Sequence, residues 1–213
     1  MLYDAKKVDL PKELYDSIEK LYSCEKKLIN HYVVIADKNG YLYDRDLIIA
    51  MIYNKSVNII DCICDACARY NVSSQIALMR IFVDSCITVY RAAQIGAKKF
   101  LLHLFNNDKL NELKINGIKL SDNYVKKQIA KDFSQFDDLY NWACKGVHFS
   151  EIALMSTLRP ESGRSIVAKI AAGNKERVKD IIQNNTTICE CVDILTKCVA
   201  KYLLTLPKGE SLT

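Results

Sequence analysis

Helix-breaking residues are scarce in this chain, because only seven glycines and three prolines interrupt its 213 residues. Glycine and proline supply most tight turns, and a β-rich domain of this length needs many of them. Half of the residues are apolar, which is enough to bury a sizeable core. We therefore predict an all-α fold, a single helical-bundle domain over residues 1–213 with about six to seven helices.

Local turn signals divide the chain into these helices. Pro11 suits the first turn of a helix, Asn39-Gly40 and Gly96 are breakers, and Ser121 suits an N-cap. Asn116-Gly117 predicts a short hairpin or an irregular segment within 109–122, and TLRPESGR (157–164) reads as a loop. The expected helices cover about 11–36, 44–70, 73–94, 97–108, 123–132, 134–155 and 175–205.

The last expected helix, 175–205, carries apolar residues at near-heptad spacing. They are Ile181, Ile188, Val192, Leu195, Val199 and Tyr202. Such a seam is typical of a helix that packs on another helix. We expect 175–205 to be a long packing or dimerisation helix, and we predict a homo-oligomer that forms through the terminal helices.

Charge and cysteine content bear on location and partners. The formal charge is +5, from 30 basic and 25 acidic residues, which permits contact with an anion or a nucleic acid without requiring it. The chain opens MLYDAKKVDLP, with charges where a signal peptide would be apolar, and no stretch of 18 residues lacks a charge. We expect a cytoplasmic protein without a membrane span, whose nine cysteines are reduced.

The cysteine spacing does not favour a metal site. Cys62, Cys64 and Cys67 fall within one expected helix, and Cys189 and Cys191 fall within another. Residues two apart on a helix point about 160° apart, so they cannot share one tetrahedral ion. The sequence also has no Gly-rich phosphate loop or nucleophile elbow. We predict neither a metal nor a cofactor.

The expected helix 73–94 is apolar around most of its axis, yet it contains Arg80, Asp84 and Arg91. At about 100° per residue, these three side chains lie within roughly 40° of one another. A charge in a buried helix must be paired, and Arg80 and Asp84 have the i,i+4 spacing that allows pairing. The pair is either an internal structural salt bridge or part of the lining of a pocket.

The expected helix 44–70 also has a polar side. Asn54, Lys55, Asn58, Asp61, Asp65 and Arg69 share a face of roughly 100°. Such a face is either the solvated side of the helix or one wall of a cleft against helix 73–94. In the second case Lys55 would bind a ligand there.

The stretch LYNWACKGVHFSE (139–151) contains a candidate for proton transfer. Tyr140, Cys144 and His148 fall four residues apart, with Lys145 before the histidine and Ser150 after it. Histidine has the side chain best suited to proton transfer near neutral pH. Tyr140 and Ser150 could position a phosphate or a sugar hydroxyl. The alternative is a histidine with only a structural role in the core or on the surface.

Three blocks of the chain carry a resemblance to a known group. They are Leu78-x-Arg80-x3-Asp84, then Gly117-x-Lys119-Leu120-Ser121-Asp122-x-Tyr124, and Tyr140-x3-Cys144-x3-His148-x-Ser150. Together they resemble an uncharacterised bacterial all-helical family, similar in appearance to the HEPN-type bundles of phage-defence and toxin–antitoxin loci. Members of the group usually have a small residue, often serine, at the position of Cys144.

The resemblance implies roles for individual residues. In catalytic HEPN proteins an arginine precedes the histidine by four to six residues, whereas Asn141 and Lys145 precede His148 here. A ribonuclease would thus need His148 as general acid–base, Tyr140 as orienting group, and Arg80 or Lys145 as phosphate clamp, with Asp84 beside Arg80. The expected partner is RNA or another phosphate-bearing ligand. The alternative function is a non-catalytic module for protein interaction or dimerisation.

Overall fold

The computed structural model describes residues 10–40, 42–147, 158–160, 166–168 and 175–207. Seven α-helices and two short antiparallel hairpins lie within these ranges, and the predicted all-α bundle is confirmed. The helices are α1 (Lys12–Asn39), α2 (Asp44–Ala68), α3 (Val72–Ile95), α4 (Ala97–Phe105), α5 (Asp122–Asp132), α6 (Phe136–Val147) and α8 (Val178–Cys198). A 3-10 turn, Lys175–Arg177, precedes α8, and a π-helical turn, Val199–Leu203, follows it.

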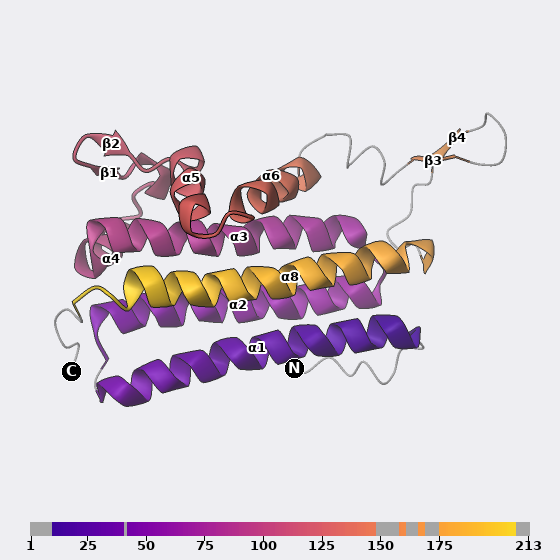
Figure 1. Ribbon diagram of the computed structural model, residues 1–213, viewed down its shortest axis with the longest axis horizontal. Coiled ribbons are helices and arrows are strands. Elements are labelled where there is room, and N and C mark those ends of the chain that lie inside the picture. The colour runs from indigo at the N-terminus through magenta and orange to yellow at the C-terminus, as the bar shows by residue number, and fades with distance from the viewer. Residues whose placement is uncertain (1–9, 41, 148–157, 161–165, 169–174, 208–213) are drawn as a thin grey trace.

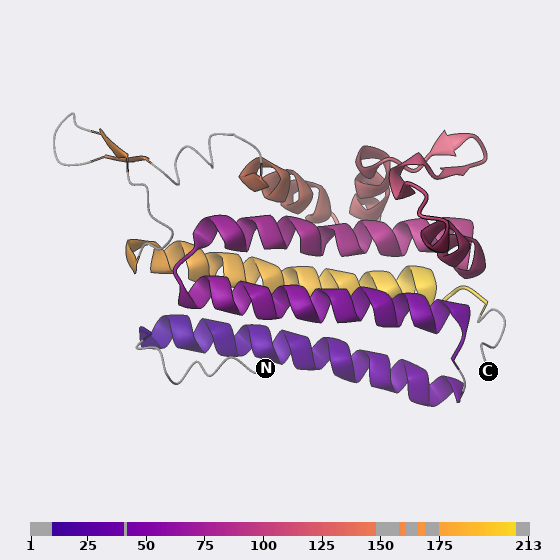
Figure 2. The same ribbon diagram turned by 180° about the vertical axis from the view of Figure 1, so that it is seen from behind.

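Four long helices form the bundle, in which α1 and α3 each pack against both α2 and α8 (Figures 1 and 2). The helices α1, α3 and α8 run in one direction and α2 runs in the other (Figure 1). The chain between α3 and α8 therefore crosses back along the bundle. On the way it forms α4, α5 and α6, of which α5 and α6 pack on the outer side of α3. Neighbours on several sides thus enclose α3.

The core runs the length of the four long helices. Fully buried side chains include Leu14, Leu21, Leu28, Ile48, Ile60, Ile63, Met79, Phe82, Ile188, Val192, Leu195 and Val199. The apolar seam predicted on the last helix is part of this core, since Ile181, Ile188 and Leu195 are 0% exposed. The seam packs against α1 and α3 of the same chain, so it is not available as a surface for a second molecule.

Side-chain caps and helix breakers shape the helix ends, and Gly96 and Ser121 act as predicted. The Asn71 side chain accepts a hydrogen bond from the Ser74 N–H at 3.1 Å and begins α3, and Gly96, with φ of 86°, ends it. Ser121 caps α5 by accepting from the Tyr124 N–H at 3.3 Å. Asn116 and Gly117 both have positive φ, which closes a two-residue turn between β1 (Lys114–Ile115) and β2 (Ile118–Lys119).

Two boundaries differ from the expectation. The segment 157–164 is not wholly a loop, because β3 (Leu158–Pro160) pairs antiparallel with β4 (Ile166–Ala168), which places Arg159 opposite Val167. The prediction was wrong there because the turn residues of 157–164 were read without the apolar run that follows and pairs with them. The helix expected over 134–155 begins at Phe136 and is described to Val147, and 148–157 lie outside the described residues.

A polar cluster that the sequence analysis did not anticipate lies inside the bundle. Gln75 of α3 donates from Nε2 to Asn185 Oδ1 of α8 at 2.6 Å and to the Ile181 carbonyl at 3.1 Å. Asn185 donates in turn to Ser17 Oγ of α1 at 3.0 Å, and the Cys67 thiol of α2 donates to Asn185 at 3.2 Å. These contacts join all four long helices at one level, so they fix the position of α8 along its neighbours.

Two helices, α2 and α3, are long and apolar enough to cross a membrane by length and composition alone. About half of each apolar window, 50% and 56%, is buried inside the bundle. A core helix of a helical bundle has the same composition, so this similarity is weak evidence for a span.

Candidate functional site

Arg80 lies on α3 where α6 packs against it, and its side chain is 16% exposed. It donates from Nη2 to Tyr140 Oη at 2.6 Å and from Nε to Cys144 Sγ at 3.1 Å. Nη1 forms an ion pair with Asp84, one turn further along α3. The guanidinium carbon also lies 4.3 Å from the centre of the Tyr140 ring, within the range of a cation–π contact.

Asp122, at the start of α5, joins this arrangement to a second arginine. It accepts hydrogen bonds from Tyr140 Oη at 3.0 Å and from Arg91 Nη2 at 2.6 Å, and Arg80 Nη2 lies 3.6 Å away. Arg91 also donates to the Leu120 carbonyl at 2.9 and 2.8 Å. We call the set Arg80, Asp84, Arg91, Asp122, Tyr140 and Cys144 the Arg80 cluster; it draws on α3, α5 and α6.

The ionisation of the cluster follows from its burial and its charges. Burial raises the pKa of Asp84, although Arg80 opposes the rise. Burial also opposes ionisation of Asp122, but hydrogen bonds from Arg91 and Tyr140 outweigh it and leave the pKa of Asp122 below its usual value. Burial raises the pKa of Tyr140, so at neutral pH Tyr140 keeps its proton and donates it to Asp122.

The cluster has little capacity left for a ligand. The Nε, Nη1 and Nη2 atoms of Arg80 are each engaged with Cys144, Asp84 and Tyr140 respectively. A phosphate would have to displace a carboxylate from the guanidinium, and burial and the cation–π contact both favour the existing arrangement. As it stands, the cluster holds α5 and α6 against α3, which matches the structural alternative given for the Arg80–Asp84 pair.

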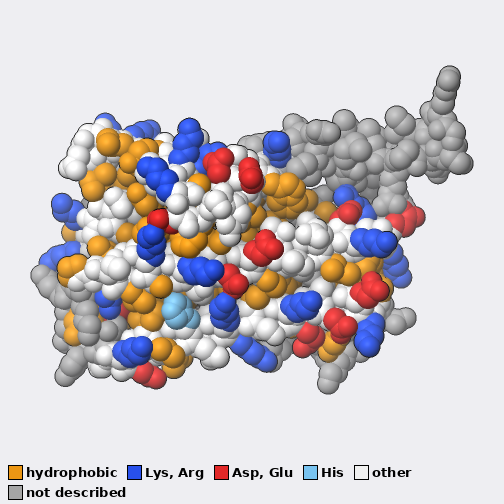
Figure 3. All heavy atoms as spheres, in the orientation of Figure 1, with side chains coloured by type: hydrophobic (Ala, Val, Ile, Leu, Met, Phe, Trp, Pro, Cys, Tyr) orange, Lys and Arg blue, Asp and Glu red, His pale blue; other side chains and the backbone are white. Residues whose placement is uncertain are grey.

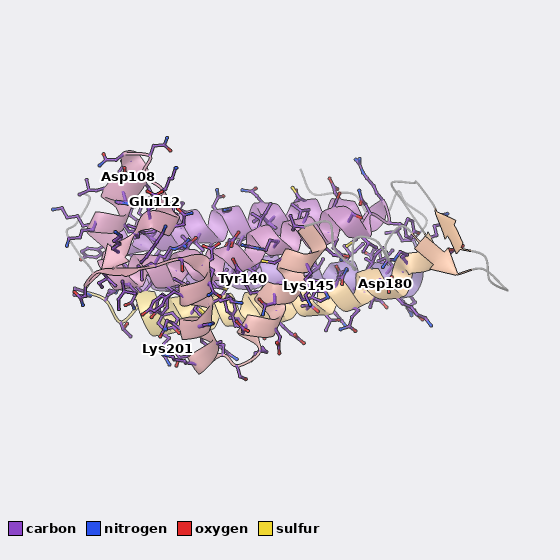
Figure 4. The ribbon with its side chains drawn as sticks, turned by 90° about the horizontal axis from the view of Figure 1, so that it is seen from above. Asp108, Glu112, Tyr140, Lys145, Asp180 and Lys201 are labelled. Carbon is purple, nitrogen blue, oxygen red and sulfur yellow. The ribbon has the colours of Figure 1, made fainter. Side chains whose placement is uncertain are left out.

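The remaining predicted site residues lie as follows. Lys55 is exposed on α2 and is close enough to Asp84 to lower the pKa of that carboxyl, though less strongly than Arg80 does. Lys145 is exposed on α6, beyond Tyr140 toward the end of that helix (Figure 4). His148 and Ser150 lie outside the described residues, so the predicted approach of His148 to Arg80 stays a prediction.

The polar side of α2 is largely solvated. Of its six residues, Asn54, Lys55, Asn58, Asp61 and Arg69 are exposed and Asp65 is half-buried. This distribution matches a solvated face more closely than the wall of a cleft.

A basic surface with exposed apolar side chains surrounds α4 and the β1–β2 hairpin, at the end of the helical bundle opposite the start of α1 (Figure 1). Within 97–119 the sequence has five lysines against two carboxylates. The lysines, Lys98, Lys99, Lys109, Lys114 and Lys119, are all exposed. Leu102, Ile118 and Phe105 are exposed among them, Phe105 by 78%. We call this surface the α4–hairpin face (upper left in Figure 3).

A cavity of about 440 Å³ opens on the α4–hairpin face. Its lining combines apolar and polar side chains: Ile95, Lys99, Leu102, His103, Asn106, Glu112, Leu113 and Lys114. His103 Nδ1 lies 3.3 Å from Asp108 Oδ2, which orients the imidazole at the edge of the cavity. Asp108 and Glu112 lie at one end of the molecule, well apart from Tyr140 (Figure 4). The cavity is therefore separate from the Arg80 cluster.

The sequence did not reveal that Asp122 forms ion pairs with Arg80 and Arg91, and it did not reveal the α4–hairpin face. Asp122 appeared only as one position of the block Gly117–Tyr124 and was given no role, because its contact with α3 is distant in sequence. The basic face had a usable signal, since three of the five net positive charges of the chain fall within 97–119. Averaging the charge over the whole chain concealed it.

The chain was compared with protein-family models, curated proteins and solved structures, and none of the three comparisons gave a match.

Proposed function

We propose that this protein is a HEPN-like helical protein that binds RNA through its α4–hairpin face. The observation that carries the proposal is the 440 Å³ cavity lined by Lys99, His103 and Lys114, with Phe105 exposed on the same helix as Lys99 and His103. Proteins that bind single-stranded RNA combine a cationic surface for the phosphates with aromatic side chains on which bases stack. Both elements are present on this one face.

The shape of the face also favours a flexible, single-stranded ligand. The cavity is large enough to admit a base, and its walls combine apolar side chains with hydrogen-bond donors and the acceptor carboxylate of Glu112. Lys119 pairs with the cavity residue Lys114 across the hairpin and is exposed, so it would contact a phosphate next to an inserted base. A rigid duplex could not place a base in the cavity without first unpairing it.

Action on the bound RNA is the further part of the HEPN resemblance. It would depend on His148 as general acid–base, because the Arg80 cluster is occupied by its own carboxylates. The same resemblance is the basis for proposing a cytoplasmic protein of a bacterial defence or toxin–antitoxin system.

Binding can be measured by fluorescence anisotropy of a labelled single-stranded RNA at several salt concentrations. We expect the double variant Lys99→Glu/Lys114→Glu to bind more weakly and to show a salt slope smaller by about 1.4, since each phosphate contact on a single strand contributes about 0.7. The control is Lys12→Glu/Lys179→Glu, which changes the net charge equally at the start of α1 and of α8. Equal losses in both double variants would refute a specific role for this face.

Stacking and cleavage have their own readouts in the same experiment. Phe105→Ala removes an exposed ring and should weaken binding by about 1–3 kcal/mol with an unchanged salt slope. Gel analysis of the RNA after incubation then compares the unmodified protein with His148→Ala. RNA that stays intact with both proteins would limit the function to binding.

Self-association is the second candidate, and a surface on α1 favours it. Ile29 and Val33 are 45% and 46% exposed and lie one turn apart. Ile29 is also part of a groove of about 330 Å³ between α1 and α2, which is lined by Ile29, Tyr32, Ala50, Tyr53, Asn54 and Val57. The proposed occupant is a second copy of the chain. Sedimentation equilibrium of Val33→Glu should show fewer oligomers, whereas Ile81→Glu, at an exposed apolar position on α3, should not.

A further inference from the structure

Two cysteines from opposite ends of the chain meet at the surface of the bundle. Cys24 lies on α1 and Cys189 lies on α8, two helices that pack along each other. Lys27 of α1 and Asp193 of α8, about one turn further along the same two helices, form an ion pair at 2.5 Å, so Cys24 and Cys189 lie at the same level of this interface. Each thiol shifts the pKa of the other, which places the two close together, and both residues are partly exposed.

Charged side chains surround the pair. On α1, Lys27 Nζ forms an ion pair at 2.5 Å with Asp193 Oδ1 of α8, and Lys20 also acts on Cys189. On α8, Glu190 and Asp193 oppose a negative charge on Cys189, whereas Lys20 favours it. The largest influence on Cys189 is the neighbouring Cys24 thiol, which lowers the pKa of Cys189. The same proximity raises the pKa of Cys24, so the two thiols titrate as a coupled pair that loses one proton before the other.

We propose that Cys24 and Cys189 form an oxidation site at which a hydroperoxide converts the two thiols into a disulfide between α1 and α8. The Cys189 thiolate attacks one peroxide oxygen, so an S–O bond forms and the O–O bond breaks. The alcohol or water that leaves takes up a proton. Cys24 then gives up its proton and attacks the sulfenic sulfur of Cys189, which forms the S–S bond and releases water. Two thiols lose two electrons in total, and the hydroperoxide gains them.

The chain holds an internal comparison for this chemistry. Cys86 of α3 and Cys198 of α8 are also close enough for Cys198 to raise the pKa of Cys86, but the two residues are only 1% and 0% exposed. A hydroperoxide must reach a sulfur to react, so contact alone is not sufficient. Cys62 is the control for access without a partner thiol, because it is exposed and lies on α2, which contributes no cysteine to either pair. Only Cys24 and Cys189 combine contact with access among these residues.

The test uses the full chain, first reduced and then treated with hydrogen peroxide at neutral pH. Remaining thiols are blocked with N-ethylmaleimide, and peptides are mapped by mass spectrometry with and without a reductant. We expect a linked peptide pair that joins Cys24 to Cys189, with alkylation retained at Cys86 and Cys198. The unfolding temperature should rise on oxidation and return on reduction, because the disulfide closes most of the chain into one loop.

Variants then separate a specific pair from general thiol reactivity. Cys62→Ser should leave the linked peptide unchanged, whereas Cys24→Ser should abolish it and leave Cys189 as a sulfenic acid that a dimedone probe captures. Free, alkylated Cys24 and Cys189 after peroxide treatment of the unmodified chain would overturn the proposal. So would oxidation of Cys62 alone, or equal formation of the Cys86–Cys198 disulfide. The mapping on the unmodified chain does not depend on any variant folding.

Discussion

The polar cluster inside the bundle allows a quantitative test of how α8 is held in position. Gln75 and Asn185 are 0% and 1% exposed, and the hydrogen bond between them is 2.6 Å long. In Asn185→Leu, Gln75 Nε2 keeps its bond to the Ile181 carbonyl, and Ser17 Oγ keeps its bond to the Leu14 carbonyl. The variant therefore loses three hydrogen bonds but leaves few groups without any partner. At about 1 kcal/mol for each of the stronger bonds, we expect a loss of about 2 kcal/mol in unfolding free energy.

The partner variant should cost more. Gln75→Leu removes the acceptor of Asn184 Nδ2, which donates to Gln75 Oε1 at 2.8 Å, and the best donor to Asn185 Oδ1. Two buried amides are then only partly satisfied, so we expect a loss of about 3 kcal/mol. In the double variant Gln75→Leu/Asn185→Leu, both members of this hydrogen bond are absent, so neither amide is left buried without the other as its partner and part of each loss of stability disappears. The loss should be about 3 kcal/mol instead of the additive value of about 5 kcal/mol.

Urea unfolding followed by far-UV circular dichroism measures all four proteins of this cycle. A matched cycle at Ser56 and Ser85 serves as control, since those hydroxyls are also buried between helices but lie 3.4 Å apart, and it should show coupling below about 0.5 kcal/mol. Additive losses at Gln75 and Asn185 would refute the conclusion that the two side chains act as one unit.

Three further predictions concern the Arg80 cluster and the hairpin. Arg80→Met removes the cation that pairs with Asp84 and lies near Asp122. Because the Asp84 side chain is 38% exposed, we expect the unfolding free energy measured in urea to fall by about 2 kcal/mol, which is less than for a fully buried pair. The pKa of Asp122 in the folded protein lies below the ordinary value of 3.8, so between these two values the unfolded chain binds more protons and stability is lost as the pH falls. Asp122→Asn should therefore flatten the loss of stability at acid pH. Asp84, whose pKa is raised, contributes the opposite slope at pH values above 3.8. Gly117→Ala places a side chain at φ of 81° and should lower the unfolding free energy by about 1 kcal/mol. Lys179→Gly, at an exposed helical position, serves as a control with an expected loss of similar size. A stable Gly117→Ala variant beside a destabilised Lys179→Gly variant would contradict the role of φ.

The sequence was sufficient for most of the fold because its signals are local. Asn71, Gly96 and Ser121 act within a few residues of themselves, and the Asn116-Gly117 turn closes on its own hairpin. Each of these features can be read without knowing what lies across the bundle. The β3–β4 hairpin was missed because the turn residues of 157–164 were read without the apolar residues Ile166–Ala168 that follow them.

Contacts between distant segments explain what could not be predicted. Gln75 and Asn185 are ordinary polar residues on helices, which normally indicate a solvated face, and only the packing of α8 against α3 buries them. The α8 seam was recognised as a packing surface, but whether its partner belonged to the same chain could not be read from spacing. For the candidate site, the Arg80–Asp84 pair followed from i,i+4 geometry, whereas Asp122 required knowledge of how α5 meets α3.

The order of the helices has a consequence for synthesis on the ribosome. The first three long helices leave the exit tunnel early, but the apolar sides of α1 and α3 that face α8 stay uncovered until residues 178–203 have emerged. During that interval the nascent chain exposes a long hydrophobic trough, which is a target for chaperones and a point of risk for aggregation. The slow step of maturation should accordingly be the arrival of the final helix, and chains that terminate before it should accumulate as chaperone clients.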